Sequence, residues 1–268
     1  MRQLLLAFQF LTIVPVKVRG EVSEKDISGS AAFFPVVGAF QGLLAAGAAL
    51  LFLKLFSAEV ACGLAVLILT LTNGGFHLDG LADTFDALAV KASGEKAFDR
   101  EKRLSVMKDS STGAIGVTAI VFAVLLKFVF LNSLFLNYPL FTVLHLLFFM
   151  PVFSKWVMIP GMFHGISARQ DGLGKIFIND TGIKTVLFSS LCIILFCIVI
   201  VPFYPDKTYL HKTIVLFPVL FAVLYMFSFM SVKFCRKRFG GITGDNLGAI
   251  SEISEILFLM VISLRRNL

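Results

Sequence analysis

Charged residues are scarce in this sequence. Asp, Glu, Lys and Arg make up only 15% of its 268 residues, whereas hydrophobic residues make up 57% and the mean hydropathy is +0.89. So few charges cannot cover a water-exposed surface, which excludes an ordinary soluble globular domain. The composition instead predicts a chain whose surface is largely in contact with lipid.

Cysteine and tryptophan are also rare. The four cysteines form no CxxC pair and lie mostly in apolar runs, which excludes a Cys-based zinc site and a disulfide framework. They are Cys62, Cys192, Cys197 and Cys235. The single tryptophan, Trp156, lies in an apolar run beside Lys155, a combination typical of an anchor at the membrane interface.

The net charge of +7 comes mainly from basic residues between the apolar runs. Membrane proteins place basic residues there for orientation and for contact with anionic lipid. We therefore expect the lipid bilayer as a partner and no nucleic acid.

Apolar runs long enough to cross a membrane recur along the chain, because a spanning helix needs about 20 such residues. We expect an all-α fold, a polytopic transmembrane helical bundle with about seven spans, in a single domain over residues 1–268. The expected spans cover 31–53, 60–72 with a polar helical extension, 113–135, 139–160, 186–203, 214–230 and a last helix that ends near 264. Residues 1–16 are expected to be retained and to lie along or partly in the membrane.

Small residues predict close packing in the first span. Gly38 and Gly42 stand four apart on one helix face, where a neighbouring backbone can approach.

Basic residues predict the orientation of the spans. The loops 91–108, 163–184 and 233–246 carry most of them and are expected to share the cytoplasmic face. The turn at 136–138 and a loop with Pro205, Lys207 and Lys212 are then outside. An odd number of spans leaves Arg265 and Arg266 outside, against the charge rule, so either the N-terminal segment or the last helix is expected not to cross fully.

Three carboxylates follow the short apolar run 60–72. Asp79, Asp83 and Asp86 are spaced i, i+4 and i+7, so on a helix they lie within an arc of about 60°. An ionised Asp at mid-bilayer costs about 2.5–3.5 kcal/mol, so such a stripe indicates a bound cation or a wet cavity. Oxygen-only ligands favour Mg²⁺ or Mn²⁺ and hence phosphoryl chemistry. The alternative is a solvated first turn with acids at the positive end of a helix.

Two further polar clusters open predicted helices. Arg103, Lys108, Asp109 and Ser110 precede a Ser/Thr/Gly stretch that can hold a phosphate, or simply form a basic loop with an N-cap. Gly240 to Asp245 precede Glu252 and Glu255, two acids within the last apolar run that we expect to face the same cavity as the aspartates. Asp245 can also serve as an N-cap.

Four ordered motifs together resemble the cobalamin synthase family, the adenosylcobinamide-GDP ribazoletransferases. They are GGFHLDGLADTFDAL at 74–88, RLSVMKDSSTGAIGV at 103–117, ARQDGLG at 168–174 and GGITGDNLGA at 240–249. The similarity covers nearly the whole chain, including FLTIVPV at 10–16 and FFPVVG at 33–38. The sequence departs from the family pattern at Ser111, Thr112 and Lys155.

The resemblance implies an inner-membrane, Mg²⁺-dependent transferase with its active site on the cytoplasmic side. It would join adenosylcobinamide-GDP to α-ribazole or its 5'-phosphate, releasing GMP. We further expect a homo-oligomer or a complex with other cobalamin-assembly enzymes.

The resemblance also assigns roles to residues. Asp79, Asp83 and Asp86 are expected to hold Mg²⁺, with Lys108, Asp109 and Asp245 as the other catalytic residues. The general base is one of Asp86, Asp109 and Asp245. Contacts with substrate are expected from His77, Arg103, Ser110, Arg169, Thr243, Glu252 and Glu255. For His77, a capping or packing role is at least as well supported, because it falls on the helix face opposite the acids.

Two other functions fit parts of the pattern. A CDP-alcohol phosphotransferase also uses a glycine-flanked acidic helix, but its signature pairs DG with a downstream Ala-Arg, whereas residues 83–87 read DTFDA. An ion-coupled transporter would carry its acids near the midplane on broken helices. Here the polar motifs adjoin the basic loops, which favours an enzyme with cytosolic substrates.

Overall fold

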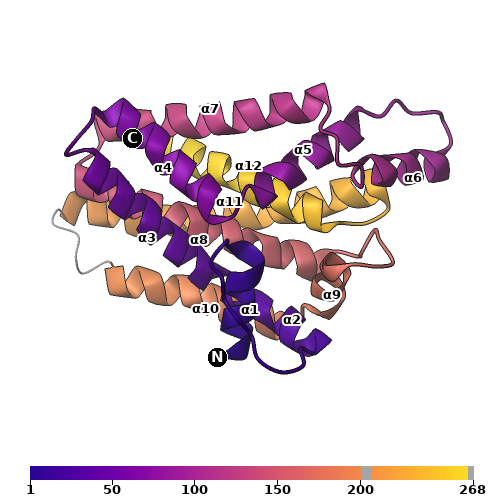
Figure 1. Cartoon of the computed structure of the whole chain (residues 1–268). Helices are drawn as coiled ribbons and strands as arrows, with labels where there is room; N and C mark the ends of the chain where they lie inside the picture. Colours follow the sequence, from indigo (N-terminus) through magenta and orange to yellow (C-terminus); the bar gives the residue numbers. More distant parts are fainter. Residues whose placement is uncertain (201–206, 265–268) are drawn as a thin grey trace.

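The computed structural model describes the backbone of residues 1–200 and 207–264, and their side chains except those of 207–214. This part of the chain consists of helices and loops with one isolated β-bridge and no strand (Figure 1). In chain order the helices are α1 (Arg2–Leu11), α2 (Glu24–Ser30), η1 (Ala31–Phe33), α3 (Phe34–Phe52), α4 (Ala58–Thr72), α5 (Phe76–Ala89), α6 (Lys96–Val106), α7 (Ala114–Asn137), α8 (Leu140–His164), α9 (Leu173–Asp180), α10 (Ile183–Ile200), α11 (Lys207–Phe239) and α12 (Gly244–Ser263).

Helix α8 is the centre of the bundle. In the most apolar 18-residue stretch of α8, 78% of the residues are buried, compared with 17% for α10. Helix α8 is therefore surrounded by protein, whereas α10 presents its side chains outward. Trp156 belongs to this interior: it is fully buried, packs on Phe221 and donates a hydrogen bond from Nε1 to Oγ of Ser190 at 3.0 Å. The expected interfacial anchor is therefore wrong, because α8 runs through the core instead of along the lipid.

Helix α3 packs directly on α8. A Cβ atom on Gly38 would collide with the backbone at Pro151, and one on Gly42 with the backbone at Phe148. The close approach predicted from these two glycines is confirmed. The pairing also shows that the two helices are antiparallel, since Gly38 meets the later residue of α8.

The polar extension of α4 is a separate helix. Helices α4 and α5 meet at an angle of 86°, across a break in which Gly74 and Gly75 have φ of 65° and 76°. These left-handed conformations suit glycine, which has no Cβ to clash. The expectation of one continuous helix is thus wrong, and α5 begins only at Phe76.

Six helices are long and apolar enough to cross a membrane, and the bent pair α4 and α5 brings the number to seven if it forms one broken span. The expected all-α bundle with about seven spans is confirmed. Helix α1 has ten residues, about 15 Å, which is half of the hydrocarbon thickness. Its last residue is held to α3 by a hydrogen bond from Gln41 Nε2 to the Leu11 oxygen, and the segment that follows it is held to the end of α4 by one from Ile13 N to the Thr72 oxygen, both at 3.0 Å.

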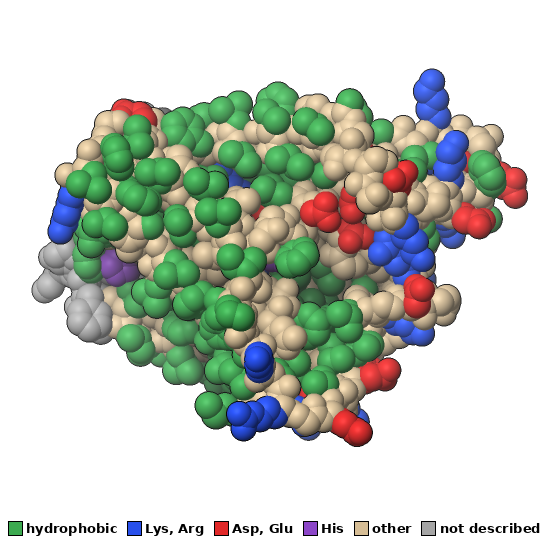
Figure 2. All heavy atoms as spheres, in the orientation of Figure 1, with side chains coloured by type: hydrophobic (Ala, Val, Ile, Leu, Met, Phe, Trp, Pro, Cys, Tyr) green, Lys and Arg blue, Asp and Glu red, His purple; other side chains and the backbone are tan. Residues whose placement is uncertain are grey.

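The three basic loops meet at one end of the bundle. Nη1 of Arg103 donates to the carbonyl oxygen of Arg238, and Ile242 and Ser167 form the β-bridge. Figure 1 shows α6, α9 and the start of α12 at this end, and Figure 2 shows most of the charged side chains gathered there beside largely hydrophobic flanks. The predicted outer loop at Pro205 and the residues Arg265 and Arg266 lie outside the described part of the chain.

Candidate active site

The acidic helix α5 lies against the start of α12. A Cβ on Gly80 would come within 2.7 Å of the carbonyl oxygen of Asp245, so the two backbones are in close contact there. Asp79 is exposed and Asp83 is half-buried, and the negative charges of Asp79, Asp245 and Asp86 all act on Asp83. The structure therefore brings Asp245 to Asp79 and Asp83, the residues with which the resemblance grouped it.

Asp86 turns toward the beginning of α7. Its Oδ2 accepts a hydrogen bond from Gly113 N at 2.7 Å, and its Oδ1 accepts one from Gly116 N at 2.8 Å. Both glycines leave room for the carboxylate, since a Cβ on either would collide with it. Asp86 thus satisfies N–H groups that the first turn of a helix leaves free, and it fixes the end of α5 to α7. Its expected role as a metal ligand stays a prediction.

The fit of these acids to Mg²⁺ depends on how the ion is normally bound. No three Asp, Glu, His or Cys side chains of the described residues come close enough to hold a metal ion by themselves. Mg²⁺ usually takes one or two protein carboxylates and completes its shell with water and substrate phosphates. The oxygen-only set of Asp79, Asp83 and Asp245 suits that mode of binding, because the diphosphate of a substrate would supply the remaining ligands.

Arg169 is the cation that contacts this set. Its Nη2 lies 2.9 Å from Oδ2 of Asp245, and its charge also acts on Asp83. The loop that carries it is held to the start of α12 by two backbone hydrogen bonds, from Ala168 N to the Ile242 oxygen at 3.0 Å and from Ile242 N to the Ile166 oxygen at 2.8 Å. The third and fourth motifs are therefore one structural unit.

The second motif reaches the site through its backbone. Its loop leads from Met107, whose sulfur is 4.0 Å from Oγ1 of Thr243, to Gly113, which binds Asp86. Lys108, Asp109 and Ser110 lie exposed between these points. The hydroxyl and N–H of Ser111 bind Asp109 at 2.6 and 3.0 Å and lower the pKa of its carboxyl group. A lowered pKa makes Asp109 a weaker proton acceptor than an ordinary aspartate.

Two of the residues that are expected to contact substrate take part in structural hydrogen bonds. Arg103 is buried, and its guanidinium donates to the carbonyl oxygens of Arg238 and Val90, which ties α6 to the ends of α11 and α5. Thr243 caps α12: its Oγ1 accepts from Asn246 N, and its own N–H donates to Oδ1 of Asn246. Both side chains thus have structural partners in this arrangement, and their expected contact with substrate stays a prediction.

Glu252 and Glu255 are buried in the bundle and do not open to the aspartates. Lys127 Nζ of α7 lies 2.5 Å from a carboxylate oxygen of each, and Lys155 Nζ of α8 lies 3.5 Å from Glu255. Two positive and two negative charges thus compensate each other away from water, as buried ions must. The expectation that these glutamates face the same cavity as the aspartates is therefore wrong. Their contact with substrate stays a prediction.

His77 lies at the end of the same network. It is buried on the face of α5 opposite Asp79, and its Nδ1 is 3.4 Å from Oγ of Ser251, which also receives a hydrogen bond from Lys155. Sequence reasoning missed Lys127 and Lys155 as partners of the glutamates. The signal was a single lysine inside each of two long apolar runs, since an intramembrane charge requires a partner.

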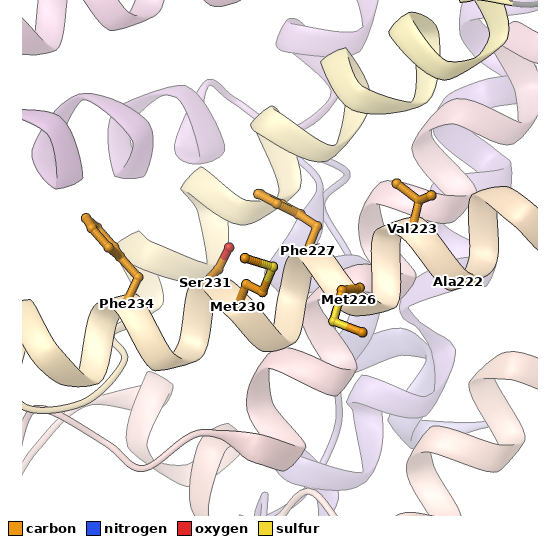
Figure 3. A pocket seen from close by; sticks show the side chains of 7 residues that line it. All are labelled: Ala222, Val223, Met226, Phe227, Met230, Ser231 and Phe234. Atoms are coloured by element: carbon orange, nitrogen blue, oxygen red, sulfur yellow. The ribbon is translucent and has the colours of Figure 1, made fainter.

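The apolar groove in Figure 3 is separate from the acidic site. It runs along α11 and is lined by Ala222, Val223, Met226, Phe227, Met230, Ser231 and Phe234. With one hydroxyl among apolar groups, it has the character of a lipid-facing surface.

The fold and site define a multi-pass helical membrane protein with a carboxylate cluster, a contacting arginine and basic loops at one end. A model of the family described as cobalamin-5-phosphate synthase matches residues 3–263. The chain therefore belongs to the cobalamin-5-phosphate synthase family.

Curated relatives agree with this assignment. The adenosylcobinamide-GDP ribazoletransferase of Thermodesulfovibrio yellowstonii is 36% identical over 98% of this chain and 96% of its own length. The proteins with this description from Geotalea daltonii and Clostridioides difficile are 34% and 31% identical, over 98% of this chain and 97% and 98% of theirs. No solved structure matches the chain. The CDP-alcohol phosphotransferase and the ion-coupled transporter are not favoured by these matches.

Proposed function

We propose that this chain is an adenosylcobinamide-GDP ribazoletransferase that works with Mg²⁺. The observation that carries the proposal is the meeting of Asp79, Asp83, Asp245 and Arg169, which come from three of the four family motifs, at one end of the bundle. Full-length similarity to relatives with this activity in their names supports it.

The proposed reaction is a phosphoryl-type transfer. A ribose hydroxyl of α-ribazole, or of its 5'-phosphate, forms a bond to the phosphorus that carries the cobinamide arm. The bond from that phosphorus to the bridging oxygen of the diphosphate breaks, and GMP leaves with this oxygen. The product is adenosylcobalamin or its 5'-phosphate, and the hydroxyl proton passes to a carboxylate base.

The residues of the site supply positioning and charge. Asp79 and Asp83 would hold Mg²⁺, which when bound neutralises charge on the diphosphate. Arg169 would contact phosphate oxygens with its guanidinium, and the exposed Lys108 would add positive potential at the loop. Asp86 keeps α5 in place through Gly113 and Gly116. Asp245 is the base candidate that adjoins the two ligand aspartates.

The proposed place of the enzyme is the inner membrane, with this end of the bundle in the cytoplasm. The clustering of the basic loops at the active-site end supports this orientation. Substrates dissolved in the cytosol would then reach the carboxylates directly.

Purified protein in detergent tests the proposal. With adenosylcobinamide-GDP, α-ribazole and Mg²⁺, it should form a cobalamin and one GMP per product, without an ion gradient, and chelation of the metal should stop the reaction. A transporter would bind ligand there without forming a covalent product, and a CDP-alcohol enzyme would release CMP from a CDP-linked donor. Protein that binds the corrinoid in a Mg²⁺-dependent manner but releases no GMP would reject the assignment.

A further inference from the structure

Arg169 makes the one ion pair of the described residues that involves the acidic site. Both partners are partly buried, with side-chain exposures of 23% for Arg169 and 26% for Asp245. The other ion pairs in the described part of the chain belong to the buried network and to Arg2 with Asp26. In the free protein, Arg169 therefore supplies the positive charge that is paired with the acidic site.

The backbone of Arg169 is fixed, whereas its guanidinium engages a single side chain, that of Asp245. Ser167 Oγ donates to the Arg169 carbonyl oxygen at 2.8 Å, and the β-bridge between Ser167 and Ile242 anchors the loop. By contrast, Nε of Arg169 is buried without a hydrogen-bond partner, and Nη2 contacts only Asp245, at 2.9 Å. The guanidinium thus holds unused donors, although it could form a bidentate pair with a carboxylate or phosphate.

A fixed loop with an underused guanidinium is suited to an exchange of partners. Asp245 attracts any cation at the site, and a divalent cation and Arg169 compete for the same carboxylate oxygens. A diphosphate bound beside Asp79 and Asp83 would present oxygens that fit the free donors of Arg169 better than its present contact does.

We propose that Arg169 is an exchangeable counter-cation: it pairs with Asp245 in the free protein and releases this carboxylate to the divalent cation when it binds the diphosphate of the substrate. This inference rests on the proposed function. Its consequence is that Arg169 acts in opposite directions on the two ligands. It weakens binding of the metal alone, and it strengthens binding of the diphosphate substrate.

The test compares metal binding and substrate binding in the full-length protein in detergent. Binding of Mn²⁺ without substrate is measured from the loss of the free-ion EPR signal, and binding of adenosylcobinamide-GDP by equilibrium dialysis. Arg169→Ala should lower the Kd for Mn²⁺ by about fivefold, because a competing charge is removed. It should raise the Kd of the corrinoid by about tenfold or more, because charge-assisted hydrogen bonds to phosphate are lost.

Two further variants separate charge from hydrogen bonding and from general loop effects. Arg169→Lys keeps the charge but not the fork, so its Kd for Mn²⁺ should stay near that of the wild type while corrinoid binding is only partly restored. Lys175→Ala is the matched control, because Lys175 follows in the same segment but donates to the carbonyl oxygen of Gln170 and contacts no carboxylate. It should leave both constants within about twofold.

The direction in which Arg169→Ala changes the Kd for Mn²⁺ decides whether Arg169 is an exchangeable counter-cation. If Arg169→Ala is folded, shown by an unchanged melting temperature, and binds Mn²⁺ no more tightly than the wild type, Arg169 is a permanent clamp and the inference is wrong. In that case GMP release by the wild type leaves the proposed function standing. Absence of GMP release from wild-type protein that binds both ligands would overturn the proposed function and this inference with it.

Discussion

Asp79 and Asp83 are the residues on which the proposed chemistry depends most directly. They lie one turn apart on α5, one exposed and one half-buried, and neither makes an ion pair in the described part of the chain. Since Mg²⁺ needs anionic oxygens, an amide at either position would remove a ligand but keep the shape of the side chain.

Asp79→Asn and Asp83→Asn should each reduce GMP release by about a hundredfold or more at saturating Mg²⁺, while the protein still inserts into the membrane. Removing a charge lowers the cost of placing α5 near lipid, so expression should hold or improve. Asp180→Asn, at the exposed end of α9, is a matched control and should keep its activity. Most of the wild-type rate in either test variant would mean that these carboxylates are only a solvated helix turn.

The residue scale also marks the limit of reasoning from spacing. The i, i+4 pattern correctly placed Asp79 and Asp83 together, because it depends only on the geometry of one helix. The pattern also brings the charge of Asp86 close enough to act on Asp83, but it gave no sign that this carboxylate binds the N–H groups of Gly113 and Gly116, 27 and 30 residues later. Local periodicity does not predict contacts between segments that are distant in the sequence.

At the scale of elements, the buried charges of α7, α8 and α12 hold the bundle in register. Lys127 bonds to both Glu252 and Glu255, and Lys155 completes the balance of charge. Helix α12 also carries Asp245 and packs against α5, so its depth in the bundle sets the distance between the acids. The network is therefore a support for the active site as well as for the fold.

Lys127→Met should destabilise the protein by about 3 kcal/mol or more, because it leaves an uncompensated carboxylate in a dry interior. The measurement is unfolding in detergent titrated with SDS. The double variant Lys127→Met with Glu252→Gln should recover much of the loss, since Glu255 keeps Lys155 as its partner. Equal destabilisation of the single and double variants would contradict a role for charge balance.

The elements themselves were largely predictable, and their junctions were not. Apolar runs of sufficient length gave the spanning helices, and Gly38 and Gly42 gave the packing of α3 on α8. The 86° bend between α4 and α5 was missed because Gly74 and Gly75 permit a left-handed backbone without requiring it. The bend is held by a local hydrogen bond from Gly75 N to Oδ1 of Asn73 and by the long-range one from Ile13 N to the Thr72 oxygen.

At the scale of the whole molecule, the bundle has two unlike ends. One end carries α6, α9, the acids and the bridged loops, and the other carries the connection from α3 to α4 (Figure 1). This polarity follows from the antiparallel pairing of α3 with α8, which sends Lys54 away from the end where α8 meets α12. If the active-site end faces the cytosol, substrates made there need not cross the bilayer.

Labelling of single cysteines from either side of the membrane tests this orientation. In a background without the four native cysteines, Lys96→Cys on α6 and Lys237→Cys on α11 should both react with an impermeant maleimide only after the cytoplasmic side is opened. Lys54→Cys, exposed at the opposite end, should react in intact cells. Reaction of positions 96 and 237 from different sides would contradict the shared end itself, which the bond from Arg103 to the Arg238 oxygen requires. Reaction of both in intact cells would keep the shared end but reverse the orientation, and the carboxylates would then face away from the cytosolic nucleotide that the proposed reaction consumes.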